Sequence, residues 1–250
     1  MTKNGKVFIC GAGPGDPKLI TLKAMETLNN CDVVLYDRLV CKEIIDQIPD
    51  TAEKIYVGRS IGDPTTHQDN TNNLMVEQAK EGKIVLRLKG GDPFIFGRGG
   101  EEAEYLVEHN VEFEIIPGIT SAVGSAAYAG IPLTHRQFAS SVAIVTGHED
   151  PEKNEPAVDW NKLAETVSTI VILMGIERLE SISHNLIKAG LSKETDIAVI
   201  ENGTTIKQRV VKGTLFDIIK KVKRAKIKPP AVIIIGKVVS LQEKLRWFDR

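Results

Sequence analysis

The sequence predicts an α/β fold made of two α/β domains. Short β-branched and apolar runs alternate with segments of helical periodicity, which is the pattern of βαβ units around a mainly parallel sheet. Glycine or polar residues follow three of these strand-like runs, at the edge where open α/β sheets bind ligands. Beyond Pro117-Gly118 a second set of strands and helices begins. We therefore expect domains over residues 1–117 and 118–250.

Composition and charge exclude several classes of protein. The 250 residues are 42% hydrophobic and 26% charged, an ordinary balance for a globular protein with a buried core. The net charge of −1 argues against a nucleic-acid partner, and no run reaches the roughly 18 apolar residues that would span a membrane. The three cysteines match no zinc spacing, and the chain begins without the apolar segment of a signal peptide. We expect reduced thiols, no metal site and a cytoplasmic location.

The first half contains five strand-like runs separated by helical or glycine-rich segments. The expected strands are residues 7–10, 32–36, 54–57, 84–89 and 113–116. The first run stops at a glycine cluster, after which apolar residues from Leu19 to Leu28 recur at helical spacing. The expected helices are residues 18–29, 70–81 and 101–109, the second of them closed by Gly82.

The second half has its own helices and strands. It opens on a helix of small residues over 121–129, which ends before Ile131-Pro132. The expected strands are residues 141–146, 169–174, 196–201 and 231–239. The expected helices are residues 179–189 and 215–224. The charged, proline-bearing segment 148–156 is expected to be an exposed loop.

A glycine turn follows the first expected strand and precedes a helix, which is the setting of a dinucleotide-binding motif. Its glycines are Gly11, Gly13 and Gly15, and the third small residue of that motif would fall on Asp16. A carboxylate there would repel a pyrophosphate at the helix N-terminus, and Pro14 removes an N–H donor. The sequence therefore favours bare backbone close to a ligand without phosphate. A nicotinamide or flavin site, or a tight turn with no ligand, is the alternative.

The loop after the fourth expected strand, residues 90–100, is the most informative part of the sequence. Five of its eleven residues are glycine, which costs chain entropy and is typical of backbone that approaches another group closely. The apolar trio Phe94, Ile95 and Phe96 predicts a pocket lining or a subunit contact. Asp92 is placed to accept hydrogen bonds from ligand hydroxyl or amine groups. A purely structural loop is the alternative.

Motifs in chain order resemble those of the tetrapyrrole methyltransferase family. They include GAGPGD at 11–16, YDRLV at 36–40, RLKGGDPFIFGRGGEE at 87–102, PGITS at 117–121 and GIPLTHR at 130–136. Shorter matches follow, among them VTGH at 145–148 and ENGT at 201–204. The matches run from residue 7 to about 248, so the resemblance covers nearly the whole chain.

The resemblance implies methyl transfer from S-adenosylmethionine to a small-molecule tetrapyrrole. Members of the family methylate uroporphyrinogen III at C2 and then C7, and so produce precorrin-2 for siroheme and cobalamin. They have two α/β domains with the active-site cleft between them, and they form homodimers. The cofactor carries a sulfonium and an adenine but no phosphate, which suits bare backbone and apolar walls. The implied cofactor contacts are Pro14, Gly90, Gly91, Asp92, Ile95, Thr120, Ser121, Met174, Gly203 and Ala231.

The resemblance also implies which residues carry the chemistry. A methylated pyrrole ring is cationic and must lose a proton, and Asp37 matches the family's proposed acceptor. The alternative for Asp37 is a turn-capping or Arg38-paired acid. Arg59 stands where the family commonly has a lysine proton donor; because arginine stays protonated, we expect an electrostatic role for it. For a substrate rich in carboxylates, the expected binding cations are Arg38, Arg87, Arg98 and Arg136.

Other functions stay open on the sequence alone. A later precorrin methyltransferase or a diphthine synthase would share the motifs only in part. A nicotinamide oxidoreductase is disfavoured by Asp16. A non-catalytic ligand-binding module is disfavoured because Asp37 and several arginines gather at the predicted strand ends. The cofactor that raises the melting temperature, S-adenosylhomocysteine or NAD(H), separates these classes.

Overall fold

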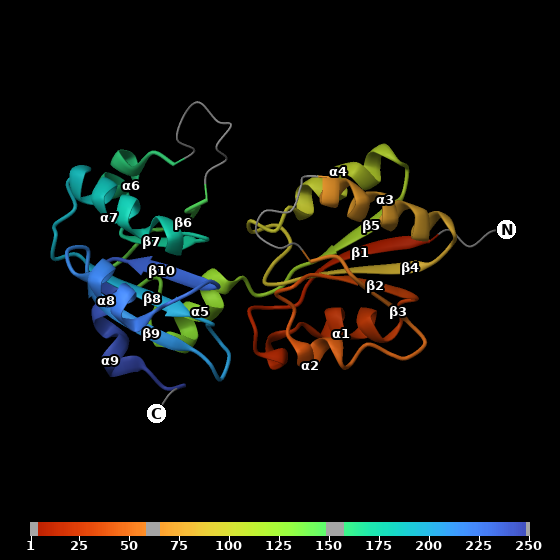
Figure 1. The fold of residues 1–250 in the computed structure, drawn as a ribbon, viewed down its shortest axis with the longest axis horizontal. Helices are drawn as coiled ribbons and strands as arrows, with labels where there is room; N and C mark the ends of the chain where they lie inside the picture. The colour runs from red at the N-terminus through yellow and green to blue at the C-terminus, as the bar shows by residue number, and fades with distance from the viewer. Residues whose placement is uncertain (1–4, 59–65, 149–157, 249–250) are drawn as a thin grey trace. The chain divides into compact units, whose positions relative to one another are not determined.

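The computed structural model describes residues 5–58, 66–148 and 158–248 (Figure 1). The chain forms two compact units, Met1–Thr120 and Ser121–Arg250. The sequence analysis expected the boundary slightly earlier, after Pro117. Each unit has its own five-stranded sheet, and the predicted α/β class with two sheets is confirmed. Arg59 and most of the loop expected at 148–156 lie outside the described residues.

The first unit alternates strands and helices along the chain (Figure 1). Its strands are β1 (Lys6–Gly11), β2 (Val33–Tyr36), β3 (Glu53–Tyr56), β4 (Ile84–Lys89) and β5 (Glu112–Ile116). Its α-helices are α1 (Leu22–Asn29), α2 (Lys42–Ile45), α3 (Thr66–Lys80) and α4 (Gly99–Glu108). The five predicted strands are all present within one residue at each end. The single turn α2 is an addition that the sequence pattern does not predict.

The helix expected over residues 18–29 is divided in two. The Asp16 carboxylate accepts a backbone N–H at 2.9 Å and caps a 3-10 turn over Pro17–Leu19. The Thr21 hydroxyl then accepts another backbone N–H at 3.1 Å and caps α1. Because each cap residue has extended rather than helical dihedral angles, two successive caps interrupt what the apolar spacing alone presents as one helix.

The strand order β3-β2-β4-β1-β5 determines where the first unit can bind a ligand. All neighbouring strands are parallel, as the sequence predicts. The connection after β1 leads to β2, toward one edge of the sheet, and the connection after β4 leads to β5, at the opposite edge. The neighbouring strands β1 and β4 therefore form a topological switch point. Such a switch point leaves a crevice outside the carboxyl ends of the two strands. The turn at 11–16 and the loop at 90–100 both begin there.

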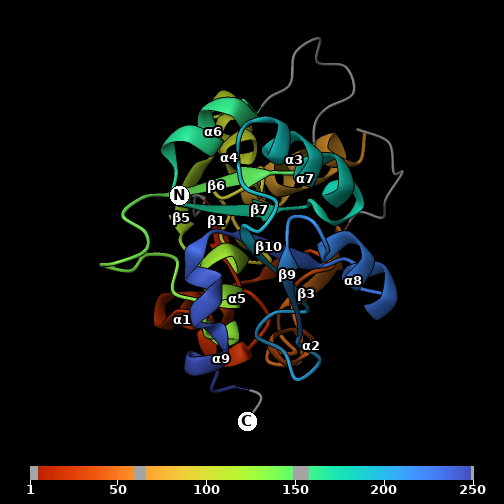
Figure 2. The same cartoon turned by 90° about the vertical axis from the view of Figure 1, so that its left-hand side faces the viewer.

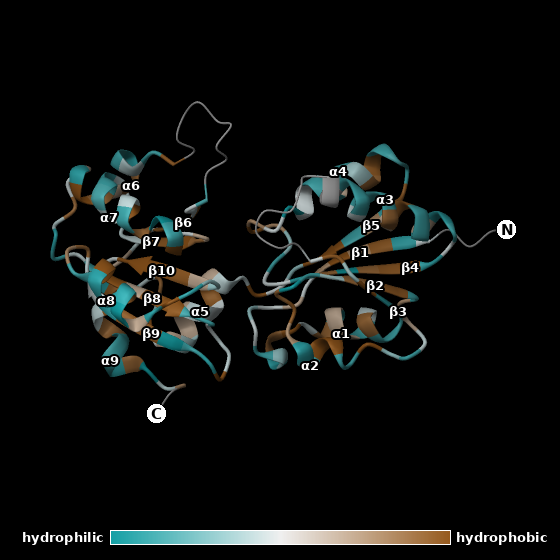
Figure 3. Cartoon of the chain, viewed as in Figure 1, coloured by the Kyte–Doolittle hydropathy of each residue, from teal (hydrophilic) through white to brown (hydrophobic). Residues whose placement is uncertain are grey.

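An apolar layer covers each face of the parallel sheet. The strands are mostly hydrophobic, whereas the helices also carry many hydrophilic residues (Figure 3). On one face Cys10 and Leu88 pack with α1 and α2. On the other face Ile9, Leu35 and Val85 pack with α3 and α4. Because strand side chains alternate between faces, the β4 residues two and four positions after Val85 share the α3–α4 face. Those two residues are charged, and this break in the pattern leads to the site described below.

The second unit carries a mixed sheet between helical layers (Figures 1 and 2). Its strands are β6 (Val142–Thr146), β7 (Thr169–Leu173), β8 (Asp196–Glu201), β9 (Arg209–Thr214) and β10 (Ala231–Ile235). Its α-helices are α5 (Ser121–Ala129), α6 (Trp160–Thr166), α7 (Leu179–Lys188), α8 (Ile218–Ala225) and α9 (Gln242–Leu245). The strand order is β6-β7-β10-β8-β9; β6 and β7 are parallel, and the other neighbouring pairs are antiparallel. Helix α5 covers one face, and α7 and α8 cover the other.

Three expectations for the second unit need correction. The strand expected over 231–239 ends at Ile235, because Gly236 has φ 136° and a 3-10 helix over Lys237–Leu241 follows. The helix expected over 215–224 begins only at Ile218. Strand β9 is present although the sequence analysis assigns none there; Lys212 and Gly213 interrupt its apolar pattern, and it exists by antiparallel pairing with β8.

The three cysteine thiols are free: Cys10 and Cys31 are buried, and Cys41 is partly buried. Burial raises the pKa of Cys10 to about 12 and that of Cys31 to about 11. Both therefore stay protonated and unreactive at neutral pH. Across the described segments, no helix is both long enough and apolar enough to cross a membrane.

Candidate active site

The loops that follow β1 and β4 pair with each other at the switch point of the first unit. The Gly13 N–H donates to the Gly91 carbonyl at 3.1 Å, and the Gly91 N–H donates back to the Gly13 carbonyl at 2.7 Å. An alanine at Gly11 would place its Cβ 2.7 Å from Gly118 Cα and 2.5 Å from the Gly91 oxygen. The glycines after three strands thus pack backbone against backbone, which side chains would prevent. Part of the glycine content that the sequence analysis assigns to ligand approach is needed for this packing.

Asp92 ties the same loops together. One carboxylate oxygen accepts the Phe94 N–H at 2.8 Å, and the other accepts the Gly118 N–H at 3.0 Å. Asp92 was expected to receive ligand donors, and the structure shows that both of its oxygens already have backbone partners. Each retains a further acceptor site, so a ligand hydroxyl or amine can still be accommodated. The observed contacts of Asp92 therefore stabilise the conformation of the loops at this edge of the sheet.

The apolar part of the loop at 90–100 is exposed on the first unit. The residue exposures are 55% for Phe94, 38% for Ile95 and 44% for Phe96. Phe96 and Arg98 both have left-handed dihedral angles, with φ of 53° and 59°. Non-glycine residues occupy this region at an energetic cost that is characteristic of functional loops. The loop therefore presents aromatic and aliphatic side chains outward instead of burying them in its own unit.

Asp37 lies at the carboxyl end of β2 and faces two cations of β4. Its backbone N–H donates to the Leu88 carbonyl at 3.2 Å, which extends the sheet pairing by one residue. One carboxylate oxygen lies 2.7 Å from an Arg87 Nη, and the other lies 3.7 Å from Lys89 Nζ. The Asp37 side chain is 26% exposed, whereas the Arg87 and Lys89 side chains are each 4% exposed. The carboxylate is thus paired with Arg87, not with Arg38 as the alternative interpretation had it.

Glu102 completes the group from the first turn of α4. Its Oε1 accepts from Arg87 Nε and from Lys89 Nζ, each at 2.9 Å, and its side chain is 0% exposed. Burial works to raise the pKa of Glu102, but Arg87 and Lys89 outweigh it and hold that pKa below the ordinary value. Two carboxylates and two cations therefore form one buried, formally neutral network, which we call the Asp37–Glu102 network.

The cations of the Asp37–Glu102 network respond differently to burial. Burial works to lower the pKa of Arg87, but the Glu102 and Asp37 carboxylates outweigh it and raise that pKa. Burial and the neighbouring Arg87 together lower the pKa of Lys89. The contact with Glu102 works to raise the pKa of Lys89, but burial and the charge of Arg87 outweigh it. Lys89 is therefore the cation that gives up its proton more readily when the network loses negative charge.

The expectation that Arg87 binds substrate needs correction. A substrate carboxylate needs an accessible guanidinium, and this one is 4% exposed and committed to two protein carboxylates. Its remaining nitrogen points at the carbonyls of Leu35 and Leu88, at 3.5 and 3.4 Å. Arg87 is positioned to orient Asp37.

The other expected substrate cations are exposed. Arg38 follows Asp37 directly, and Arg98 caps α4 and pairs with Glu101. Arg136 lies in the second unit, inside the turn closed by the bridge between His135 and Ala139. Arg59 falls outside the described residues. Exposure is necessary for binding a large anion, and these positions stay predictions.

The second unit gathers the remaining cofactor positions at one edge of its sheet. Strands β7 and β8 run in the same direction because both are antiparallel to β10. Met174 follows β7, Gly203 follows β8, and Ala231 opens β10 opposite Glu201. Ser121 is the first residue of α5, and a Cβ on Gly203 would meet the Ser125 Cβ at 2.5 Å. The edge is therefore close-packed against α5.

Three residues with left-handed backbone dihedral angles lie at this same edge. Met174, Asn202 and Thr204 have φ of 55°, 49° and 68°. For a β-branched residue such as Thr204 this conformation is an outlier, and such strain clusters at ligand-binding sites. Met174 is 53% exposed, although a methionine after a buried strand is ordinarily part of a core. Both observations favour a ligand at this edge.

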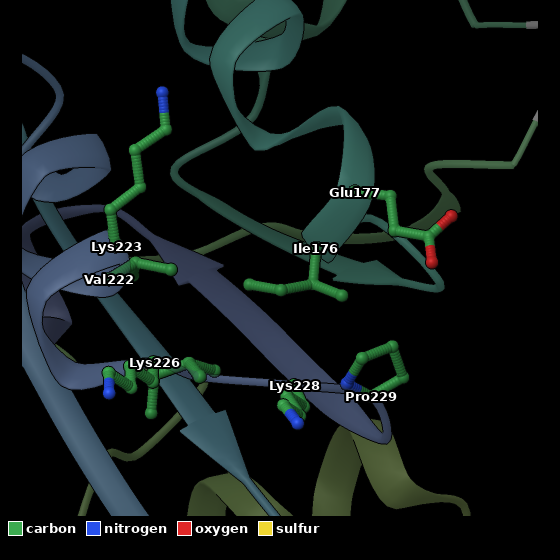
Figure 4. A pocket seen from close by; sticks show the side chains of 8 residues that line it. Ile176, Glu177, Val222, Lys223, Lys226, Lys228 and Pro229 are labelled. Carbon is green, nitrogen blue, oxygen red and sulfur yellow. The ribbon is translucent and has the colours of Figure 1, made fainter.

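A hollow on the second unit lies elsewhere (Figure 4). Its volume is about 350 Å³, and it is lined by Ile176, Glu177, Val222, Lys223, Lys226, Ile227, Lys228 and Pro229. None of the expected site residues lines it. Lys223 pairs there with Glu180 of α7 at 3.1 Å, in a contact between exposed side chains. The hollow has the character of a solvated surface beside a basic helix.

Sequence reasoning missed the role of Glu102. The signal was present in β4, where two cations alternate with leucines in a strand that lies between two others. A cation buried in the middle of a sheet needs a buried counter-charge. A search for a carboxylate among the apolar positions of the next helix would have found Glu102.

Comparisons with known proteins agree with this geometry. A family model described as tetrapyrrole (corrin/porphyrin) methylases matches residues 6–219. A relative from Methanosarcina barkeri, named S-adenosyl-L-methionine-dependent uroporphyrinogen III methyltransferase, is 51% identical over 241 residues, which cover 96% of this chain and 94% of the relative. A siroheme synthase from Pseudoalteromonas atlantica is 52% identical over 244 residues, which cover 98% of this chain and 52% of that protein.

Solved structures show the same fold. Uroporphyrin-III C-methyl transferase from Thermus thermophilus, complexed with S-adenyl homocysteine, matches with a TM-score of 0.80 at 38% identity. The match covers 94% of this chain and 99% of that chain. Because the family model and the relatives match most of the sequence, the chain belongs to the tetrapyrrole (corrin/porphyrin) methylase family.

Proposed function

We propose that the protein is an S-adenosylmethionine-dependent C-methyltransferase that methylates uroporphyrinogen III at C2 and C7 and so produces precorrin-2. The observation that carries the proposal is 51% identity, over 96% of the chain, to a relative named for uroporphyrinogen III methylation. The solved relative with S-adenyl homocysteine supports the methyl donor. The product lies on the route to siroheme and cobalamin, and the similarity to a siroheme synthase supports that place.

The chemistry of both sheet edges suits S-adenosylmethionine. The ligand has no phosphate, and the turn at 11–16 offers Asp16 and Pro14 where a phosphate would need N–H donors. The paired glycine loops present bare backbone, and Met174 and Ile95 present exposed apolar side chains. We assign the cofactor positions of the first unit to Pro14, Gly90, Gly91, Asp92, Ile95 and Thr120. Those of the second unit are Ser121, Met174, Gly203 and Ala231.

Asp37 accepts the proton that the methylated ring must lose. In the transfer, a ring carbon forms a bond to the methyl group as the carbon–sulfur bond breaks, and the ring becomes cationic. Because every β-carbon of this substrate already carries a side chain, the methylated carbon holds no hydrogen, and the cation is neutralised when a base removes a proton from a pyrrole nitrogen or an adjoining bridge carbon. Asp37 is the partly exposed carboxylate of the Asp37–Glu102 network, and Arg87 orients it. Arg59 cannot replace it as a base because a guanidinium stays protonated.

The substrate carboxylates are held by exposed cations. Arg38, Arg98 and Arg136 are the candidates, and Arg59 adds charge without exchanging protons. A net charge of −1 gives the protein no general attraction for an anion, so the binding cations must be local. We also propose a cytoplasmic homodimer without a nucleic-acid partner; the exposed Phe94 and Phe96 favour burial against a subunit, which light scattering can test.

A thermal-shift measurement separates the proposed cofactor from a nicotinamide. S-adenosylhomocysteine at 100 times its dissociation constant is expected to stabilise the protein by about 2.7 kcal/mol and to raise the melting temperature. NADH at the same concentration should leave it unchanged, because the turn at 11–16 lacks a phosphate cradle. A shift with NADH and none with S-adenosylhomocysteine would overturn the proposed function. Adenosine serves as the control for binding through the base alone.

A further inference from the structure

Strand β4 and helix α4 place Glu102 directly behind the residues that hold Asp37. Arg87 and Lys89 are two positions apart and share the face of the sheet that α4 covers. Glu102 enters from the first turn of α4 and contacts both of them at 2.9 Å. Asp37 contacts the same two side chains at 2.7 and 3.7 Å. The two cations therefore contact both a buried, inner carboxylate and a partly exposed, outer one.

The two carboxylates differ in exposure. Glu102 is 0% exposed, whereas Asp37 is 26% exposed at the ligand-binding edge of the sheet. Only the outer carboxylate can reach a substrate. The inner one is out of reach of any ligand at that edge, and its contacts with Arg87 and Lys89 connect it to Asp37.

Glu102 fixes the orientation of the Arg87 guanidinium. Its Oε1 accepts from Nε, while the two terminal nitrogens face Asp37 and the carbonyls of Leu35 and Leu88. A guanidinium is planar, so fixing Nε fixes the direction of both terminal nitrogens. The contact between Glu102 and Nε therefore fixes the position of the terminal nitrogen that contacts Asp37.

We propose that Glu102 is a positioning residue for the proton acceptor, and that it acts through Arg87 and Lys89 to hold the Asp37 carboxylate in place. The inference deepens the proposed function and rests on Asp37 as the group that takes the ring proton. With Glu102 in place, Arg87 and Lys89 stay in contact with one buried carboxylate even while Asp37 carries the ring proton.

Glu102→Gln tests the inference. The amide keeps the shape and one acceptor but removes the charge. We expect kcat for methylation of uroporphyrinogen III to fall about 10- to 100-fold, the size of loss known for residues that orient metal ligands in the same indirect way. The KM for S-adenosylmethionine and the dissociation constant of S-adenosylhomocysteine should stay at the wild-type values. Glu104→Gln, an exposed position in the same helix, is the matched control and should keep full activity.

A second variant keeps the test decisive if Glu102→Gln is unstable. Glu102→Gln/Lys89→Met restores the charge balance of the interior, and we expect its melting temperature to recover while kcat stays low. If kcat recovers together with the melting temperature, Glu102 serves only the fold and the inference is wrong. Full kcat in Glu102→Gln would also overturn it. Full kcat in Asp37→Asn would instead overturn the role of Asp37, so the two failures are distinguishable.

Discussion

The Asp37→Asn variant is expected to lose about 10²- to 10⁴-fold in kcat, the contribution typical of a general base. Asparagine has nearly the same shape and can still accept from Arg87, but an amide does not take up the ring proton. The loss of one negative charge leaves Arg87 and Lys89 facing Glu102, and Lys89 can respond by releasing a proton. The fold should therefore survive, and the KM for S-adenosylmethionine should change little.

Rates of methyl incorporation under anaerobic conditions, with calorimetric binding of S-adenosylhomocysteine, measure these quantities. Asp50→Asn is the matched control, since Asp50 is an exposed acid before β3. A variant at Asp37 that turns over at the wild-type rate would show that another group, or solvent, removes the proton. A variant that no longer binds S-adenosylhomocysteine would show that Asp37 holds the shape of the site.

The Arg87→Leu variant is expected to lower the free energy of unfolding by about 3–5 kcal/mol, because breaking a buried ion pair leaves an uncompensated charge. Glu102 would keep one cation partner, Lys89, and Asp37 would lose its contact at 2.7 Å. The side chain of Arg87 is 4% exposed, so solvent cannot replace the lost contacts. The change in stability is therefore far larger than for an exposed arginine such as Arg38, which serves as the control in an Arg38→Leu variant.

The spectroscopic probe for Arg87→Leu must report on the first unit. Both tryptophans, Trp160 and Trp247, belong to the second unit, so tryptophan fluorescence would miss the change. Urea unfolding followed by circular dichroism reports on both units. The double variant Arg87→Leu/Glu102→Leu should recover part of the loss, because removing both members of a buried pair costs less than removing one. Equal stability of Arg87→Leu and the wild type would contradict the importance of the Asp37–Glu102 network.

Helices and strands with a strong local sequence pattern could be predicted from the sequence. Strand β4 and helix α5 have the predicted bounds, because a strand that opens on three apolar residues and a helix of small residues each carry their own signal. Strand β9 has no such signal, because Lys212 and Gly213 break its pattern and its stability comes from pairing with β8. Local preference was thus overridden by a contact that the sequence pattern does not show.

The candidate site could be predicted from the sequence only in part. Family motifs pointed to Asp37, and strand ends pointed to the sheet edge where it lies. The direction of Arg87 was misjudged because a motif says which residues occur together but not which face of a strand carries them. Strand β4 lies between two other strands, and its side chains alternate between the two faces of the sheet. Arg87 and Lys89 therefore both lie on the face that α4 covers, where they contact Glu102. That pairing depends on how α4 packs on the sheet, which only the folded unit reveals.

The most direct test of the proposed function is an anaerobic incubation of the purified protein with S-adenosylmethionine and enzymatically generated uroporphyrinogen III, read by product mass and absorption. We predict a gain of two methyl groups and the formation of precorrin-2. A gain of one would contradict the second methylation and direct attention to Arg59, where the family commonly has lysine. No methylation of uroporphyrinogen III by a protein that binds S-adenosylhomocysteine would contradict the proposed substrate.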